Sequence, residues 1–220
     1  MNNVTNILKR TPPDSGPAQA LEAARRRVKA LLVDPESITS AQAKVILSRY
    51  TAGVGDNFIK WLGAALVSAR SLEARFAASE NLMVEVRDNH PKMLRDFAKG
   101  SGALPGREDY AHAAVCLDEI HLHVRHMSGI YLISLIQLLE TVSADYIPWL
   151  AAISKKLGNT NFNYCDIHGE ADAHHAEQFR KAVVAESQFY KSPLPEIEEG
   201  YGSGVYFLEH LLSHSSAPAN

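Results

Sequence analysis

The stretch IYLISLIQLLE, residues 130–140, decides the fold class of this chain. Ser134 and Gln137 are the only interruptions of the apolar and aromatic run 130–139, and Glu140 follows it. A helix that is apolar on nearly every side has to be buried, because it has no face left for water. The run is also too short to span a bilayer. It therefore predicts a central helix that is enclosed by other helices.

Helical periodicity continues on both sides of this run. In residues 18–33, for example, apolar side chains recur at Leu21, Ala24 and Val28, as on one face of a helix. No segment alternates apolar and polar residues as a strand would. We therefore predict an all-α chain whose seven or eight helices pack as one bundle. Residues 1–17, rich in Pro, Ser and Gly near their end, predict a flexible leader before a single domain of residues 18–220.

Glycines set two of the expected helix boundaries. Gly53 and Gly55 predict a break, followed by one long helix from about residue 57 to residue 87. The glycine-rich segment 200–204 predicts a turn that precedes the last helix.

Composition excludes several classes of protein. A chain of 220 residues that is 46% hydrophobic and 21% charged is neither disordered nor fibrous, and it suits one domain. The net charge of −3, without a basic stripe, argues against a nucleic-acid partner. Two cysteines cannot form a disulfide framework, and residues 1–10 hold no apolar core of signal-peptide length. We expect a soluble, cytoplasmic protein that does not bind a membrane.

The most specific polar segment is DIHGEADAHH, residues 166–175. His168, Asp172 and His175 have the spacing i, i+4 and i+7, so on a helix they project from one face. Two imidazoles and one carboxylate are a ligand set that suits non-haem iron. The alternative is a polar surface face that holds three histidines by chance.

Two further carboxylates are candidates for the same chemistry. Glu140 closes the apolar run, so it is a candidate buried carboxylate that needs a partner or a cation. Glu85 and His90 lie in the segment NLMVEVRDNHP, residues 81–91. Their i, i+5 spacing puts them about 140° apart on a helix. They converge only if the helix ends or bulges between them, and otherwise Glu85 is an ordinary exposed acid.

The order of these motifs resembles that of the haem-oxygenase-like diiron oxidases and oxygenases. The resemblance rests on Asn-Leu-x-x-Glu, Asn-His-Pro, a lone Glu in an apolar helix and His-x-x-x-Asp-x-x-His, and it covers roughly residues 57–190. It implies a haem-oxygenase-like helical bundle that binds two Fe(II) ions and uses O2 as a co-substrate. The metal ligands that it implies are Glu85, His90, Glu140, His168, Asp172 and His175, with Glu140 and Asp172 as the catalytic carboxylates. The gap between Glu85 and His90 is shorter than in the family pattern, so Glu80 or Asp88 could replace Glu85.

The resemblance also implies a role in specialised metabolism. The expected substrate is a small molecule of the amino-acid type, and conversion of a halogenated tryptophan to a nitrile is one candidate reaction. Arg70, Arg75 and Arg87 are candidates for binding a substrate carboxylate. The alternative is a metal-free, thiaminase-like module of the same fold that binds or hydrolyses a small heterocycle, for which Cys165 is the candidate nucleophile. We also allow for a homodimer.

A second histidine cluster competes with the first. Glu119, His123 and His126 also have the spacing i, i+4 and i+7. The family that the chain resembles has no ligands on the corresponding helix. We therefore interpret these residues as surface or supporting groups, with a second metal site as the alternative.

Overall fold

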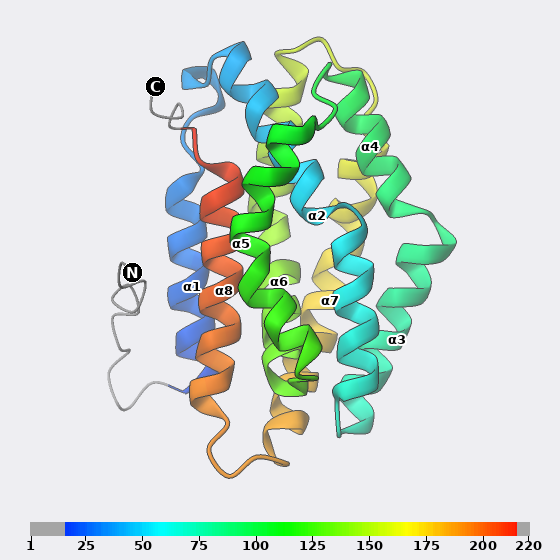
Figure 1. Ribbon diagram of the computed structural model, residues 1–220, viewed down its shortest axis with the longest axis vertical. Coiled ribbons are helices and arrows are strands. Elements are labelled where there is room, and N and C mark those ends of the chain that lie inside the picture. Colours follow the sequence, from blue (N-terminus) through cyan, green and yellow to red (C-terminus); the bar gives the residue numbers. More distant parts are fainter. Residues whose placement is uncertain (1–15, 215–220) are drawn as a thin grey trace.

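The computed structural model describes residues 16–214, and in residues 169–173 it describes the backbone but not the side chains. This part of the chain is all-helical and contains no strand, which confirms the predicted fold class (Figure 1). The leader predicted for residues 1–17 falls mostly outside the described residues. The elements are α1 (Pro17–Leu31), a short 3-10 helix (Pro35–Ser37), α2 (Ser40–Ser68), α3 (Leu72–Arg87), α4 (His90–Gly100), α5 (Arg107–Arg125), α6 (Gly129–Lys155), α7 (Asn163–Ser187) and α8 (Leu194–Leu212).

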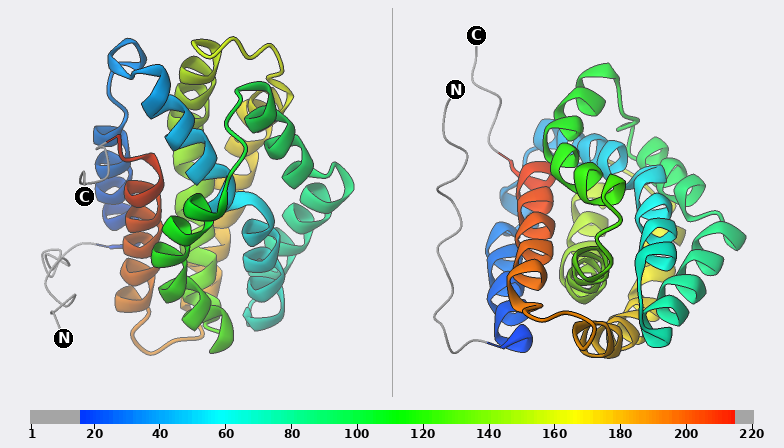
Figure 2. Two further views of the ribbon diagram at one scale, coloured as in Figure 1. Left: turned by 45° about the horizontal axis from the view of Figure 1, so that its top comes forward. Right: turned by 60° about the horizontal axis from the view of Figure 1, so that its bottom comes forward.

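Helix α6 forms the centre of the bundle. It packs against α7, α8, α2 and α1, and the near end-on view on the right of Figure 2 shows it surrounded by the other helices. No residue from 130 to 140 is more than 6% exposed. By length and composition α6 could cross a membrane, but 83% of its most apolar window is buried inside the bundle. The same combination is found in the core helices of soluble proteins.

The predicted long helix over residues 57–87 is wrong, because two helices occupy this segment. Helix α2 kinks at Gly55 and ends at Ser68, and α3 begins at Leu72. The break is stabilised by Glu186 of α7, whose fully buried carboxylate accepts the backbone N–H groups of Arg70 (2.9 Å) and Ser71 (2.7 Å). The Ser71 side chain then caps α3. A partner 115 residues away in the chain leaves no local signal for this boundary.

The predicted turn at residues 200–204 is also wrong, because this segment lies inside α8. Its glycines serve helix packing instead. A Cβ atom on Gly200 would lie 2.6 Å from the backbone oxygen of Tyr131, and one on Gly204 would lie 2.8 Å from Leu138. Helix α8 therefore approaches α6 more closely than side chains at these positions would allow.

We predict that Gly200→Ala destabilises the protein. The added methyl group meets the backbone of α6, and overpacking of this kind costs about 1–3 kcal/mol. Gly63→Ala is the matched control, because a Cβ atom at Gly63 meets nothing within 4 Å in the middle of α2. The control should gain about 0.5–1 kcal/mol from helix propensity. Urea unfolding of both variants measures the difference, and equal stabilities would contradict the close packing of α8 on α6.

Candidate metal site

Glu85 and His90 meet at the junction of α3 and α4. Helix α3 ends at Arg87, Asn89 adopts the left-handed conformation (φ 55°, ψ 51°), and α4 begins at His90. This change of direction brings Glu85 Oε1 within 2.8 Å of His90 Nδ1, and both residues are buried. The helix thus ends between the two residues, which is the condition that their i, i+5 spacing required.

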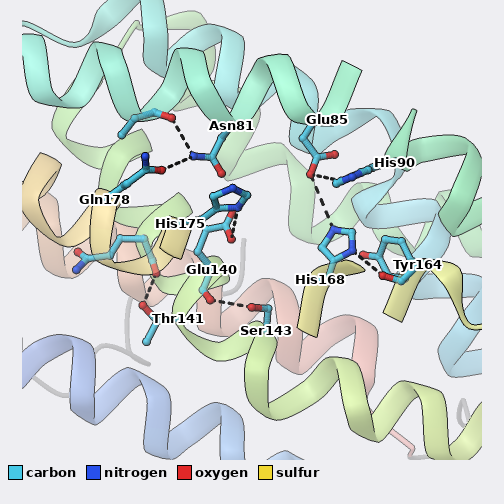
Figure 3. Close-up of polar contacts among 12 residues, drawn as sticks. Asn81, Glu85, His90, Glu140, Thr141, Ser143, Tyr164, His168, His175 and Gln178 are labelled. Carbon is cyan, nitrogen blue, oxygen red and sulfur yellow. Dashed lines mark hydrogen bonds and ion pairs between the residues drawn. The ribbon is translucent and has the colours of Figure 1, made fainter. Parts of the chain in front are cut away.

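His168 completes a group of three from the opposite side of the site. Its Nε2 lies 3.9 Å from Glu85 Oε1, and its Nδ1 lies 2.7 Å from the carbonyl oxygen of Tyr164 (Figure 3). Since a carbonyl only accepts, Nδ1 carries the proton and Nε2 offers its lone pair to the site. One donor atom from each of Glu85, His90 and His168 lies within 4.8 Å of the others, which is close enough for one metal ion.

Glu140 and His175 form a second group beside the first. Glu140 Oε2 lies 3.6 Å from His175 Nδ1. Burial raises the pKa of the Glu140 carboxyl, and the neighbouring His175 offsets part of this rise. Glu140 lines one pocket together with Glu85, His90 and His168, so the second group reaches the cavity of the first through Glu140.

The structure does not place the remaining candidate ligands, Asp172, Glu80 and Asp88, in the pocket. Asp172 lies on α7, but its side chain falls outside the described residues, so its predicted ligand role stays a prediction. The two possible replacements for Glu85 point elsewhere. Glu80 is exposed and accepts a hydrogen bond from Gln178, whereas Asp88 pairs with Arg87 at 2.8 Å. The geometry therefore favours Glu85 over Glu80 and Asp88.

The walls of the pocket are mostly apolar and aromatic. Besides the four site residues they comprise Tyr50, Val54, Gly55, Phe58, Trp61, Pro91, Leu94, Leu139, Ser143, Tyr146, Tyr164 and Phe207. The free volume is about 40 Å³, which holds a molecule the size of O2 or a few waters. A larger organic substrate must therefore move lining side chains as it binds.

Two polar features of this wall bear on ligand binding. Trp61 is fully buried, and its indole N–H has no acceptor among the described residues, whereas Trp149 donates to the carbonyl of Val33 at 2.7 Å. No lysine or arginine lines the pocket in the described part of the chain. The pocket wall therefore includes a tryptophan whose N–H is unpaired, and no lysine or arginine of the described residues.

The arginines expected to bind a substrate carboxylate are engaged elsewhere. Arg70 donates to the carbonyl of Phe189 and lies over a tyrosine ring, and Arg75 donates to the carbonyl of Ala69. Arg87 pairs with the neighbouring Asp88. The structure thus gives none of the three a place on the pocket wall.

The residues of the site fit iron. His90 Nε2 is buried and has no partner among the described residues, which is costly unless something binds it. Burial lowers the pKa of His168, so this imidazole is neutral and able to bind a metal. Imidazoles and carboxylates together are the donors that non-haem iron prefers.

Sequence reasoning missed several supporting groups. Tyr164 orients His168 through its backbone carbonyl, and its hydroxyl lies 2.9 Å from that of Tyr50. Trp61 and Phe207 reach the pocket from α2 and α8 and stack edge to face at 5.3 Å between ring centroids. The i−4 position of Tyr164 relative to His168 is a usable signal, but nothing local to Trp61 or Phe207 indicates their role.

The fold and the buried carboxylate–imidazole cluster define a helical metalloprotein. Comparison with family sequence models agrees, because a haem-oxygenase-like family described as iron-containing redox enzymes matches residues 49–210. The chain belongs to this family. A comparison with curated protein sequences gives no match.

The cysteine alternative can be weighed from the same geometry. Cys165 is only 7% exposed, and burial, with a smaller contribution from the charge of Asp166, raises the pKa of its thiol to about 12. A nucleophilic cysteine needs a lowered pKa, because the thiolate is the reactive form. Cys165 has the opposite environment, which does not favour the thiaminase-like alternative.

We predict that neither cysteine reacts rapidly with a dithiobis-nitrobenzoate reagent in the folded protein. Burial also raises the pKa of Cys116 to about 12. At about pH 8, roughly one thiol in ten thousand is then ionised. The protein unfolded in guanidinium is the control, and it should release two equivalents at once. Fast reaction of one thiol in the folded state would restore Cys165 as a candidate nucleophile.

Proposed function

We propose that this protein is a non-haem diiron oxidoreductase that uses O2 to oxidise a small organic molecule. One observation carries the proposal. Two carboxylates and two imidazoles, from α3, α4, α6 and α7, line one buried pocket, and a third imidazole, that of His175, pairs with one of the carboxylates. A cluster of this composition in an iron-containing redox family is suited to iron.

The residues divide into two proposed sets of ligands. Glu85, His90 and His168 would hold one ion, and Glu140 and His175 would hold the other, with Asp172 as the further ligand expected on the same helix face as the two α7 histidines. When bound, Fe(II) supplies the electrons that reduce O2, which the protein side chains cannot do.

The chain itself contributes charge, orientation and exclusion of water. The two buried glutamates offset the positive charge of the ions, so the site tolerates them in a low-dielectric core. Tyr164 fixes the orientation of His168 through the 2.7 Å contact to its carbonyl. The aromatic wall of Phe58, Trp61 and Phe207 keeps bulk water from the reacting atoms.

We further propose that the substrate is of the amino-acid type and enters the pocket with an apolar, aromatic part. The apolar lining supports an aromatic part, and Trp61 offers one donor for an acceptor atom on it. A substrate carboxylate would find no protein cation on this wall, so the iron ions are its expected partners. Formation of a nitrile from a halogenated tryptophan stays a prediction of the sequence. The cytoplasmic location, the lack of nucleic-acid and membrane partners, and a homodimer also stay predictions.

Anaerobic loading with Fe(II) tests the diiron proposal. We expect two iron ions per chain in the wild type. His168→Ala should lose at least one of them, because His168 is one of the three donors that the described residues place in its group. His126→Ala is the matched control, since this exposed histidine lies outside the pocket. Iron analysis after gel filtration, with thermal melts to confirm folding, gives the result. No iron above background in the loaded wild type would overturn the proposal.

The substrate part of the proposal has its own test. With the Fe(II)-loaded protein, L-tryptophan or L-phenylalanine should accelerate O2 consumption several-fold more than L-lysine or L-aspartate, because the pocket wall is aromatic and lacks protein cations. An oxygen electrode measures these rates. Equal acceleration by the charged amino acids would show that the proposed preference for aromatic substrates is wrong. The diiron proposal would not be affected, because the iron analysis tests it separately.

A further inference from the structure

A second group of potential metal ligands lies between α5 and α8. Glu119 and His123 are one helical turn apart on α5, and Glu199 faces them from α8. One donor atom from each lies within 4.8 Å of the others. His123 Nε2 lies 3.4 Å from Glu199 Oε1. Two donor atoms bound to one tetrahedral Zn²⁺ at about 2.1 Å are about 3.4 Å apart, so this pair already has the spacing of metal ligands.

Neighbouring groups hold two of these side chains in place. The His123 ring stacks on Tyr131 with centroids 3.6 Å apart and planes within 10°. His123 Nδ1 lies 3.4 Å from Ser128 Oγ, which leaves Nε2 directed at the carboxylates. Ser203 donates to Glu119 Oε1 at 3.0 Å. Metal-binding imidazoles and carboxylates are usually oriented by such outer contacts.

The Tyr131 hydroxyl is an independent sign of a missing ligand. Tyr131 is fully buried, and its hydroxyl has no hydrogen-bond partner among the described residues. Ser203 lies near it and donates to Glu119 Oε1, but it forms no hydrogen bond with the Tyr131 hydroxyl. A water molecule bound to an ion at this group would supply the partner that the hydroxyl lacks.

We propose that Glu119, His123 and Glu199 bind one divalent transition-metal ion of the Zn²⁺ class, in addition to the iron site. Imidazoles and carboxylates are both Zn²⁺ ligands, and three protein ligands with water in the fourth position are a known arrangement for this ion. The ion joins α5 to α8 and stabilises their contact. From the sequence, the alternative second metal site consisted of Glu119, His123 and His126. The structure brings Glu199 to Glu119 and His123 in place of His126.

This site is separate from the iron site. Tyr131, which stacks on His123, and Glu140, which lines the iron pocket, are nine residues apart on α6. The two sites are therefore about 13 Å apart along the axis of that helix. None of the three proposed ligands lines the iron pocket. The second ion therefore acts at the contact between α5 and α8, and its binding does not depend on the proposed reaction.

Zinc binding in a background that lacks two of the proposed iron ligands tests the proposal. The starting variant is His90→Ala/His168→Ala, stripped of metal, saturated with Zn²⁺ and passed through gel filtration. We expect one Zn²⁺ per chain. Adding His123→Ala should reduce this to background, whereas adding the matched exposed change His126→Ala should not. Ser203→Ala should weaken Zn²⁺ binding about 10–100-fold in calorimetric titrations, because it frees the Glu119 carboxylate.

Two results would overturn the proposal. One is the absence of Zn²⁺ above background in the starting variant, which would mean that His123 and Glu199 form only an ion pair. The other is retention of the ion after His123→Ala. If the starting variant fails to fold, Zn²⁺ binding to the Fe(II)-loaded wild type is compared with that of Glu199→Gln, and equal binding would overturn the proposal in the same way.

Discussion

The burial of Glu85 and Glu140 is the constraint on which the rest of the structure depends. Transfer of a carboxylate into a protein core costs several kcal/mol even after relaxation, unless opposite charge compensates it. Each of the two glutamates has only imidazole partners among the described residues: His90 (2.8 Å) and His168 (3.9 Å) for Glu85, and His175 (3.6 Å) for Glu140. Burial lowers the pKa of His168, so at least this partner carries no positive charge. Metal cations would supply the missing charge, which explains why a core would retain such a cluster.

The packing of the helices fixes the position of Glu85 on α3 relative to the histidines on α7. Helix α6 provides Glu140 from the centre, and α3 and α7 pack against each other on one side of it (Figures 1 and 3). Polar contacts tie α3 to α7: Glu186 binds the backbone at the start of α3, and Gln178 accepts a hydrogen bond from buried Asn81 and donates one to Glu80. These contacts lie C-terminal to His175 on α7. The position of Glu85 relative to the α7 histidines therefore follows from polar contacts as well as from apolar packing.

Sequence patterns were sufficient for the fold class and for part of the site. The apolar run of residues 130–139 predicted the central helix, because a helix that is apolar on all sides must be buried. Glu140 directly follows this run, so its burial was predicted as well. The spacing of His168 and His175 was equally local. The meeting of Glu85 with His90 needed the left-handed Asn89, which a sequence permits but does not require. The start of α3, the glycines of α8 and the placement of the arginines depend on distant partners, so no local pattern could reveal them.

The central claim is that this pocket binds two iron ions through residues of α3, α4, α6 and α7. Anomalous diffraction at the iron edge, from crystals grown anaerobically with Fe(II), tests it most directly. The account predicts two iron peaks in the pocket, one within bonding distance of Glu85 and His168 and one within bonding distance of Glu140 and His175. A pocket without iron, or iron bound only at Glu119, His123 and Glu199, would contradict it.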